Sequence, residues 1–352
     1  MNRRRFITSL AAATALPAVA SSMTRDKGSE TTASEGTAGP LIRPGAIAPG
    51  QTVGIVCPAS GVMTKELSDF ITLCQRWNVT VKLGANVSKR YGYLAAPDEE
   101  RARELMDFVN DPTVDAIVCG RGGYGVMRIL PMLDFQAIRA AGKIIMGFSD
   151  ITALLIAVQQ LSGLVTFHGP VASSTFDAFT TTAMTDVVLQ APTKAERRSS
   201  AFSDPQVRVL SPGLARGRLT GGNLAMIVST LGTRYEIDTN GAILFLEEIN
   251  EEPYRIDRML TQLWLAGKLQ QCAGIALGNF RDCEAKGTSR SEPSFPLQQV
   301  IQDRISSLKL PAVYGLPFGH VKSKLVLPLG VQAELDADNR SLRLLEDAVT
   351  HA

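Results

Sequence analysis

One short stretch, 143–155, constrains the fold most strongly because a strand pattern changes to a helix pattern within a few residues. Residues 144–146 form an apolar run typical of a buried strand, and Gly147 interrupts it. From Asp150 onward, apolar residues recur at helical spacing: Ile151, Leu154, Leu155 and Val158. The pattern predicts a sharp turn at Ser149, which would hold the hydroxyl above a sheet at a helix N-terminus, where free N–H groups favour developing negative charge.

This turn has two interpretations. A serine here can be a nucleophile, although the Gly-x-Ser-x motif lacks the second glycine of the usual nucleophile elbow. Ser149 or Asp150 can equally be an ordinary helix N-cap, which is the commoner use of such residues. Taken alone, the turn favours a cap, so the nucleophile hypothesis depends on what the rest of the chain supplies.

Strand and helix patterns alternate through the first half of the chain. The strand-like runs are 52–57, 79–83, 114–119, 143–146 and 165–167. Helical patterns lie between them at 67–77 and 97–109, and a third begins at Asp150. The alternation predicts a parallel sheet covered on both faces, as in Rossmann-like or flavodoxin-like domains.

The second half also mixes the two patterns, but it ends in short strands. Strands are expected at 241–246 and 273–277, helices near 256–264 and 297–308, and short strands at 325–327 and 342–345. These features predict a smaller C-terminal α/β domain with a partly antiparallel, barrel-like sheet. The fold class is therefore α/β with two domains.

A length of 352 residues also favours two domains. We place the N-terminal α/β domain at 46–195 and the C-terminal domain at 196–350, because 176–211 is polar and less regular. Ahead of both, 21–45 begins with a stretch rich in Ser, Thr, Gly and Ala and without hydrophobic periodicity, which predicts a disordered linker.

Residues 1–20 have the features of an export signal. Arginines at 3–5 precede an apolar, alanine-rich stretch at 6–19 that is too short to span a bilayer comfortably, and 18–20 is an Ala-x-Ala cleavage site. The segment resembles a bacterial twin-arginine signal, with an ordinary secretory signal as the alternative. Both predict a periplasmic or otherwise exported product. No later stretch is long and apolar enough for a membrane span.

Composition excludes several classes of partner. The formal net charge is +2, without the basic patch that nucleic-acid binding needs. The five cysteines are odd in number, and Cys57, Cys119 and Cys272 lie in or beside apolar runs, which predicts free thiols rather than a disulfide framework. No motif has the ligand spacing of a zinc or calcium site, so we expect neither a metal nor a cofactor.

A serine nucleophile needs a base and a group that orients the base. The chain has three histidines, of which His351 is penultimate, while His168 ends a strand pattern and His320 ends a Gly- and Pro-rich loop. The residues alone leave His168 and His320 equal. Glu247 and Glu248 follow an apolar strand, where a carboxylate can orient an imidazole, although acids are also favoured before a helix.

A glycine loop at 120–125 has the literal spacing Gly-x-Gly-x-x-Gly of a dinucleotide site. Three features oppose that reading: the loop is not in the first strand–helix unit, Pro131 interrupts the helix after it, and no acid-tipped strand follows at the expected distance. We interpret the loop as a source of backbone N–H groups for an oxyanion.

Taken together, the motifs resemble the LD-carboxypeptidase family of serine peptidases, which also includes microcin C immunity peptidases. They follow the family's order and cover roughly 50–330. The matching stretches are 120–125 with 128–130, 147–152, 168–170, 221–224, 246–248, 252–260, and 315–320 with 327–330. The exported leader is the main departure, because familiar members that recycle murein peptides are cytoplasmic.

The resemblance implies a Ser-Glu-His triad, with Ser149 as nucleophile, His320 as base and Glu247 as the orienting acid. It also implies an oxyanion hole formed by the backbone N–H groups of Asp150 and Gly123. By this resemblance, the nucleophile and its two partners come from different domains, which places the active site between them.

The implied substrate is a murein tetrapeptide, cut between diaminopimelate and the terminal D-alanine. Gly122 is an alternative oxyanion donor to Gly123, and Arg121 is a candidate for binding substrate carboxylates or a structural tie of its loop. A peptidase of the same fold that cleaves a peptide-nucleotide antibiotic is the second hypothesis, and a non-enzymatic periplasmic binding protein is the third. Family members are often homodimers, so a dimer is an open expectation.

Overall fold

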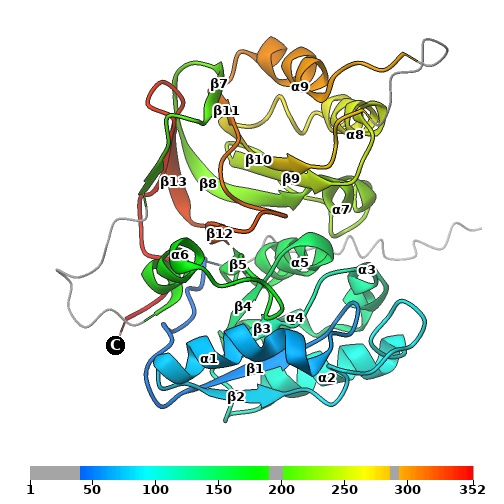
Figure 1. Ribbon diagram of the computed structural model, residues 1–352, viewed down its shortest axis with the longest axis vertical. Helices are drawn as coiled ribbons and strands as arrows, with labels where there is room; N and C mark the ends of the chain where they lie inside the picture. The colour runs from blue at the N-terminus through cyan, green and yellow to red at the C-terminus, as the bar shows by residue number, and fades with distance from the viewer. Residues whose placement is uncertain (1–39, 190–200, 286–292, 352) are drawn as a thin grey trace, which may run out of the picture. The chain divides into compact units, whose positions relative to one another are not determined.

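The computed structural model describes residues 40–189, 201–285 and 293–351. The predicted export signal, 1–20, and most of the predicted linker, 21–45, lie outside the described residues. The described residues form two β-sheets with helices packed on them (Figure 1). The prediction of an α/β fold with a flavodoxin-like parallel sheet and a second, partly antiparallel, barrel-like sheet is confirmed.

The first sheet has the strand order β12-β5-β4-β3-β1-β2. Its strands are β1 Thr52–Val56, β2 Thr80–Leu83, β3 Ala116–Cys119, β4 Ile144–Gly147, β5 Thr166–His168 and β12 Leu327–Leu329. The first five run parallel, in the order 2-1-3-4-5 of flavodoxin-like sheets. In such sheets ligands bind beyond the carboxyl ends of the strands, and the loops after β1, β3 and β4 meet there.

Helices cover both faces of this sheet, which explains why its strands are apolar at nearly every position. Ile117 and Ile145 face the core shared with α2 and α4, whereas their neighbours Val118 and Met146 face the core shared with α1 and α6. The helices are α1 Ser68–Arg76, α2 Asp98–Asn110, α3 Val126–Ile129, α4 Phe135–Ala141, α5 Thr152–Ser162 and α6 Ala178–Val188, with the 3-10 turns η1 Thr64–Leu67, η2 Leu130–Met132 and η3 Ser149–Ile151.

The second sheet is mixed, with the strand order β6-β14-β13-β8-β9-β10-β11-β7. Its strands are β6 Ala201–Ser203, β7 Arg208–Ser211, β8 Leu214–Asn223, β9 Ile243–Ile249, β10 Gly274–Arg281, β11 Ala312–Tyr314, β13 Gln332–Asp336 and β14 Ser341–Leu344. The helices α7 Leu224–Ser229, α8 Pro253–Leu265 and α9 Leu297–Ile305, with the short turn η5 Ser306–Leu308, accompany it. Among the described residues, this second sheet has eight strands and the first has six.

Strand β8 explains the barrel-like curl that the sequence predicted. Its first half, from Leu214 to Arg218, pairs antiparallel with β13, and its second half, from Leu219 to Asn223, pairs parallel with β9. Gly217 lies at this change of partner, where a Cβ would come 2.2 Å from the carbonyl oxygen of Gly241. Gly217 therefore lets two backbones approach closely where the pairing partner of β8 changes.

Three local expectations were wrong. Strand β12, expected in the second sheet, pairs antiparallel with β5 at the edge of the first. The segment 176–211, expected to be less regular, contains α6, β6 and β7 among its described residues. The predicted linker ends earlier than residue 45, because Ile42 N–H donates to Gly163 O at 2.8 Å and Pro44 O accepts from Thr350 N–H at 2.8 Å.

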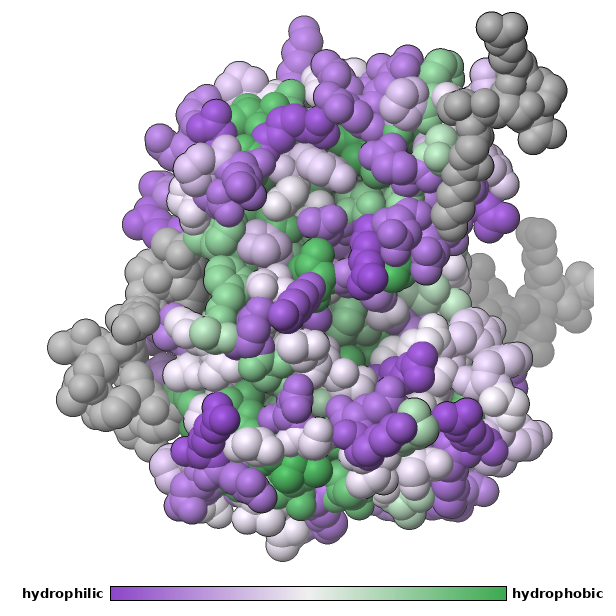
Figure 2. All heavy atoms as spheres, viewed as in Figure 1, coloured by the Kyte–Doolittle hydropathy of each residue, from purple (hydrophilic) through white to green (hydrophobic). Residues whose placement is uncertain are grey.

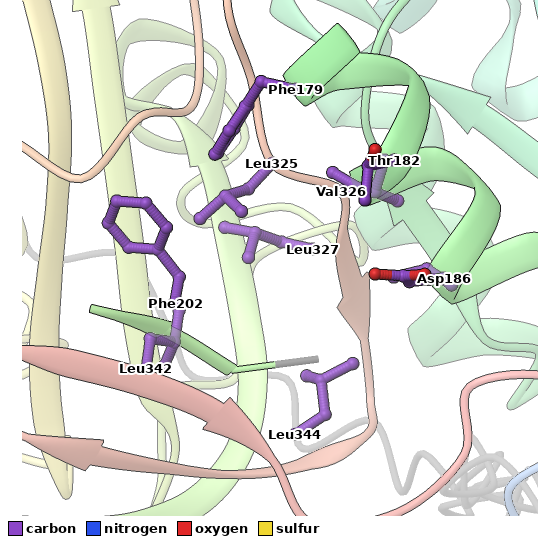
Figure 3. A pocket seen from close by; sticks show the side chains of 11 residues that line it. Phe179, Thr182, Asp186, Phe202, Leu325, Val326, Leu327, Leu342 and Leu344 are labelled. Carbon is purple, nitrogen blue, oxygen red and sulfur yellow. The ribbon is translucent and has the colours of Figure 1, made fainter. Parts of the chain in front are cut away.

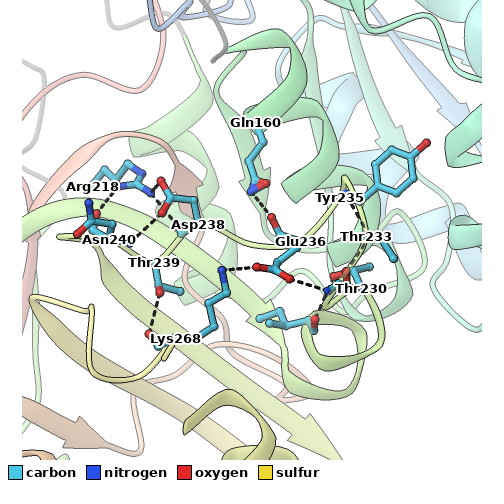
Figure 4. Close-up of polar contacts among 12 residues, drawn as sticks. Gln160, Arg218, Thr230, Thr233, Tyr235, Glu236, Asp238, Thr239, Asn240 and Lys268 are labelled. Carbon is cyan, nitrogen blue, oxygen red and sulfur yellow. Dashed lines mark hydrogen bonds and ion pairs between the residues drawn. The ribbon is translucent and has the colours of Figure 1, made fainter. Parts of the chain in front are cut away.

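Helix α5, which follows the Ser149 turn, contacts strands β4 and β5 of the first sheet and also β8 and α7. It is buried from Thr152 to Val158 on every side, as expected for a helix that is apolar all round. At its C-terminal end, Gln160 Nε2 donates to Glu236 O at 2.7 Å (Figure 4). Glu236 also pairs with Lys268 at 2.5 Å, so polar contacts fix the outer edge of this packing.

Polar and charged side chains cover much of the face drawn in Figure 2, with apolar side chains visible between them. Among the described residues, no helix combines the length and the apolar character that crossing a membrane requires. An apolar hollow lies beside α6.

Candidate active site

Ser149 lies where β4 ends and α5 begins, in the strained conformation of a nucleophile elbow. Its φ is +64°, a left-handed value that non-glycine residues rarely adopt and that often marks a functional site. Gly147 makes the turn sterically feasible, because a Cβ there would come 2.8 Å from the Ile151 side chain. Ile151 stands where the second glycine of the usual motif would be, and its side chain packs against the bare Cα of Gly147.

His320 lies in the loop after β11, and its ring reaches the serine. Nε2 is 3.2 Å from Ser149 Oγ, within hydrogen-bond distance. The preceding Gly319 has φ +90°, and a Cβ on it would come 2.5 Å from Glu247 Oε2. Only glycine therefore lets the loop bring the imidazole this close to the carboxylate.

Glu247 holds the other side of the same imidazole. His320 Nδ1 lies 2.7 Å from Glu247 Oε2, and the glutamate side chain is fully buried near the end of β9. A carboxylate only accepts hydrogen bonds, so Nδ1 carries the proton and Nε2 is free to accept the Ser149 hydroxyl proton. The structure brings Ser149, His320 and Glu247 into one hydrogen-bonded chain, as the predicted triad requires.

Glu248, the alternative acid, points away from this chain. Its carboxylate accepts hydrogen bonds from Asn223 Nδ2 at 2.9 Å, Ala225 N–H at 2.7 Å and Ile249 N–H at 2.9 Å. Burial raises the pKa of Glu248 to about 7, against the lowering effect of these hydrogen bonds. Although Glu248 lies in β9, its carboxylate accepts a hydrogen bond from the first turn of α7, which indicates a helix-capping role.

His168, the alternative base, ends β5 and is buried. Neither ring nitrogen has a hydrogen-bond partner among the described residues. Its ring packs edge-on against Phe148, Phe245 and Phe318. Burial lowers the pKa of His168 to about 4, so the ring is neutral at physiological pH. It shares Phe148 with His320, whose ring is 4.9 Å from the phenyl ring, but it does not reach Ser149.

The glycine loop after β3 lies against the serine. A Cβ on Gly122 would come 2.9 Å from Ser149 Cβ, and Gly123 has φ +110° with Ser60 directly beside it. The Gly123 N–H has no hydrogen-bond partner within the described ranges. The Asp150 N–H belongs to the first turn of a helix, where N–H groups have no partner within the helix. Asp150 directly follows Ser149, and Gly123 directly follows Gly122, which packs against Ser149. The role of these two N–H groups as oxyanion donors stays a prediction.

Arg121 is exposed at the start of this loop. Its side chain has no ion pair with any described residue, so the structural-tie interpretation finds no support in that part of the chain. Its proposed role in substrate binding stays a prediction. In the described ranges no group of three or more His, Cys, Asp or Glu side chains has the arrangement of a metal site.

Sequence reasoning missed two features of the site. Lys324 is buried near the triad, whereas the sequence gives no reason to expect a loop lysine to be anything but exposed. Asp150 was weighed as a cap and as an N–H donor, but its carboxylate accepts from Val126 N–H at 2.9 Å, across the glycine loop. Both contacts depend on tertiary structure.

An apolar pocket of about 170 Å³ lies between α6 and the strands β6, β12 and β14 (Figure 3). None of the triad residues lines it. Its walls are Phe179, Thr182, Ala183, Asp186, Val187, Phe202, Leu325, Val326, Leu327, Leu342 and Leu344. The candidate site is defined by the hydrogen-bonded side chains of Ser149, His320 and Glu247, and these do not line this hollow.

Comparisons with known proteins match both halves of the chain. Residues 53–169 match the LD-carboxypeptidase N-terminal domain and residues 216–335 its C-terminal domain. A probable murein peptide carboxypeptidase of Bacillus subtilis is 39% identical over 305 residues, which are 85% of this chain and 93% of the relative.

Solved structures agree with this assignment. A muramoyltetrapeptide carboxypeptidase from Oxalobacter formigenes is similar with a TM-score of 0.72 and 33% identity, over 84% of this chain and 98% of that one. A microcin C7 self-immunity protein has a TM-score of 0.78 at 23% identity, over 88% and 100% of the two chains. At that identity, the second likeness shows the fold alone.

The fold and the two matched domains define an enzyme class, the serine carboxypeptidases, which are hydrolases. Within that class, the chain belongs to the LD-carboxypeptidase family. The family predicted from the ordered motifs is confirmed.

Proposed function

We propose that this protein is a serine LD-carboxypeptidase that releases the terminal D-alanine of murein tetrapeptides through an acyl-enzyme. The observation that supports this most directly is the chain of two hydrogen bonds from Ser149 through His320 to Glu247. The similarity to carboxypeptidases named for murein or muramoyl peptides points to the same substrate class.

In the first half of the reaction, Ser149 Oγ attacks the carbonyl carbon of the last amide, and its proton passes to His320 Nε2. The buried Glu247 carboxylate stabilises the imidazolium that forms. The tetrahedral oxyanion accepts hydrogen bonds from the N–H groups of Asp150 and Gly123, each worth about 3–4 kcal/mol in comparable sites.

His320 then gives its proton to the leaving nitrogen, the C–N bond breaks, and D-alanine departs. Water attacks the ester carbonyl of the acyl-enzyme while His320 accepts a proton from the water. Collapse of this second intermediate returns the proton to Ser149 Oγ and frees the shortened peptide as a carboxylic acid. The exposed Arg121 suits a substrate carboxylate through its planar guanidinium.

The test is mass spectrometry of the purified protein after incubation with a diaminopimelate-containing murein tetrapeptide. We expect loss of one D-alanine with the parent and none with Ser149→Ala. EDTA should leave the release intact, because a serine nucleophile activated by His320 needs no metal. An intact tetrapeptide with folded parent protein would contradict the proposed substrate.

A second candidate function, hydrolysis of a peptide-nucleotide, is favoured by one observation. Tyr93 and Tyr124 form an exposed aromatic pair beside the glycine loop, 64% and 41% exposed, with ring centroids 5.5 Å apart. Ser60, which abuts Gly123, donates to Tyr93 O at 2.6 Å. Exposed aromatic rings can stack on a nucleobase. Cleavage of an aminoacyl sulfamoyl nucleoside, with the tetrapeptide left intact, would select this function.

We also propose that the protein acts outside the cytoplasm, exported by the twin-arginine route. The support is the sequence of residues 1–20 and the five buried free thiols, which suit folding in a reducing cytosol before export. Conversion of Arg3 and Arg4 to lysine keeps the charge, so it should abolish export by this route and spare an ordinary secretory signal. Cell fractionation would measure the difference.

A further inference from the structure

Lys324 follows His320 by four residues, in the loop that leads to β12, and only 6% of it is exposed. Lysine is rarely buried without a partner, because an ammonium loses strong hydration. Among the described residues, Nζ has no ion pair and no hydrogen bond. It lies 4.9 Å from the centroid of the Phe148 ring, a cation–π contact that compensates only part of the lost hydration.

The backbone of the loop fixes this position. Lys324 N–H donates to Thr180 Oγ1 at 3.1 Å, and the hydroxyl of the preceding Ser323 donates to Asp177 Oδ2. Asp177 in turn caps α6, since its Oδ1 accepts from Thr180 N–H at 2.8 Å. Two consecutive loop residues are therefore bound to the first turn of α6, and the lysine is held in the interior.

The charges around Lys324 do not supply it with a dedicated counter-ion. Glu247 and Asp177 favour its charged form, whereas Arg281 opposes it. Glu247 is already hydrogen-bonded to His320, and Asp177 to Ser323. Burial lowers the pKa of Lys324 to about 8, so the group is a cation at neutral pH. A buried cation without its own anion is suited to an anionic ligand.

The position also fits the reaction. The Phe148 ring that Lys324 covers belongs to the residue before Ser149, and it lies 4.9 Å from the His320 ring. In the last residue of a peptide, the amide nitrogen and the carboxylate carbon are only about 2.5 Å apart. The carboxylate of the departing residue must therefore lie close to the nitrogen that His320 protonates. Both His320 and Lys324 contact the Phe148 ring, so the lysine belongs to the same neighbourhood.

We propose that Lys324 binds the terminal carboxylate of the peptide substrate and so restricts the enzyme to the last residue. The inference rests on the proposed carboxypeptidase function and assigns it a specificity-determining residue. Arg121, exposed at the start of the glycine loop, then serves a carboxylate elsewhere on the substrate.

The test compares two substrates, the tetrapeptide and the same peptide with a C-terminal D-alaninamide, in the parent and in Lys324→Met. With the free acid, the variant should lose about 10- to 100-fold in kcat/KM, mainly through KM, as expected for a lost hydrogen bond to a charged group. With the amide, the parent should already be slow and the variant should lose nothing further. Lys322→Met, at an exposed lysine of the same loop, is the matched control and should match the parent on both peptides.

Thermal unfolding separates binding from a structural role. Methionine replaces a buried unpaired charge with an apolar chain of similar length, so Lys324→Met should unfold at the same or a higher temperature than the parent. Equal losses on acid and amide, or no loss on either, would overturn the role of Lys324 while the proposed function stands. No release by the parent from either peptide would overturn the proposed function and this inference with it.

Discussion

Asp150 Oδ2 accepts a hydrogen bond from Val126 N–H at 2.9 Å, so the residue after the proposed nucleophile holds the first residue of the helix that follows the glycine loop. Its other oxygen, Oδ1, is buried without a partner in the described part of the chain. Gly125, with φ +127°, turns the loop into this helix. One side chain therefore joins the two halves of the proposed oxyanion hole, the N–H groups of Asp150 and Gly123.

The first prediction concerns the hydrogen bond from Val126 N–H to Asp150 Oδ2. Asp150→Asn keeps an oxygen acceptor for Val126 N–H and should retain most activity. Asp150→Ala leaves that buried N–H unpaired, which should cost about 1–3 kcal/mol of stability and lower kcat by about tenfold or more as the loop loosens. Urea unfolding and steady-state kinetics measure the two effects. Equal kcat in the two variants would show that the carboxylate does not position the loop.

The second prediction follows from the protonation of the same carboxyl. Burial raises the pKa of Asp150 from 3.8 to about 6, so the native state holds this proton more tightly than the unfolded chain does. Its contribution to stability is complete below about pH 4 and is lost as the pH rises through 6. Between pH 4 and 7, the parent should therefore lose up to about 3 kcal/mol relative to Asp150→Asn, which cannot titrate. A constant difference across this range would contradict the raised pKa.

The third prediction uses two glycines of the His320 loop. Gly319 and Gly315 both have positive φ, +90° and +97°, so alanine strains either backbone by a similar amount, about 1–2 kcal/mol. Only at Gly319 does the added Cβ collide, 2.5 Å from Glu247 Oε2, whereas at Gly315 nothing lies within 4 Å. Gly319→Ala should abolish most activity, and Gly315→Ala should lower the melting temperature but keep kcat. Full activity in Gly319→Ala would exclude a tight fit between this loop and Glu247.

The parallel pairing of β1 to β5 and the turn at Ser149 could be predicted because both follow from patterns that are local in sequence. Each parallel strand follows the previous one through a helix, and the change from strand to helix pattern around Gly147 locates the turn within a few residues. The ordered motifs added the family, which no single motif specified.

Other features depend on contacts that the pattern does not contain. Glu247 and Glu248 are neighbours in β9, and consecutive strand residues point to opposite faces. The sequence therefore identifies two faces but not which of them meets His320. Strand β12 is close in sequence to the second sheet, yet it pairs with β5 of the first. The burial of Lys324 likewise depends on α6, which the polar composition of its segment concealed.

The fourth prediction concerns the five cysteines, all of which are buried free thiols. Burial raises the pKa of Cys57, Cys74 and Cys272 to about 12, so thiolate is scarce at neutral pH. The native protein should react very slowly with a thiol reagent such as DTNB, and the denatured protein should react fully without prior reduction. A need for reductant before the denatured chain reacts fully would reveal a disulfide.

The last prediction separates the two adjacent acids. Glu247→Gln should lower kcat by about a thousandfold or more with little change in stability, because the amide can no longer stabilise a protonated His320. Glu248→Gln should keep kcat but lower stability, because Glu248 accepts hydrogen bonds from Asn223, Ala225 and Ile249, and an amide nitrogen cannot accept.

The pH dependence gives the assignment a second readout. Burial raises the pKa of Glu248 from 4.5 to about 7, so its contribution to stability is complete below about pH 4.5 and is lost as the pH rises through 7. The parent and Glu247→Gln should both show this loss, and Glu248→Gln should not. If Glu248→Gln instead lost kcat while Glu247→Gln kept it, the acid of the triad would be Glu248, and the hydrogen bond between Glu247 and His320 would have only a structural role.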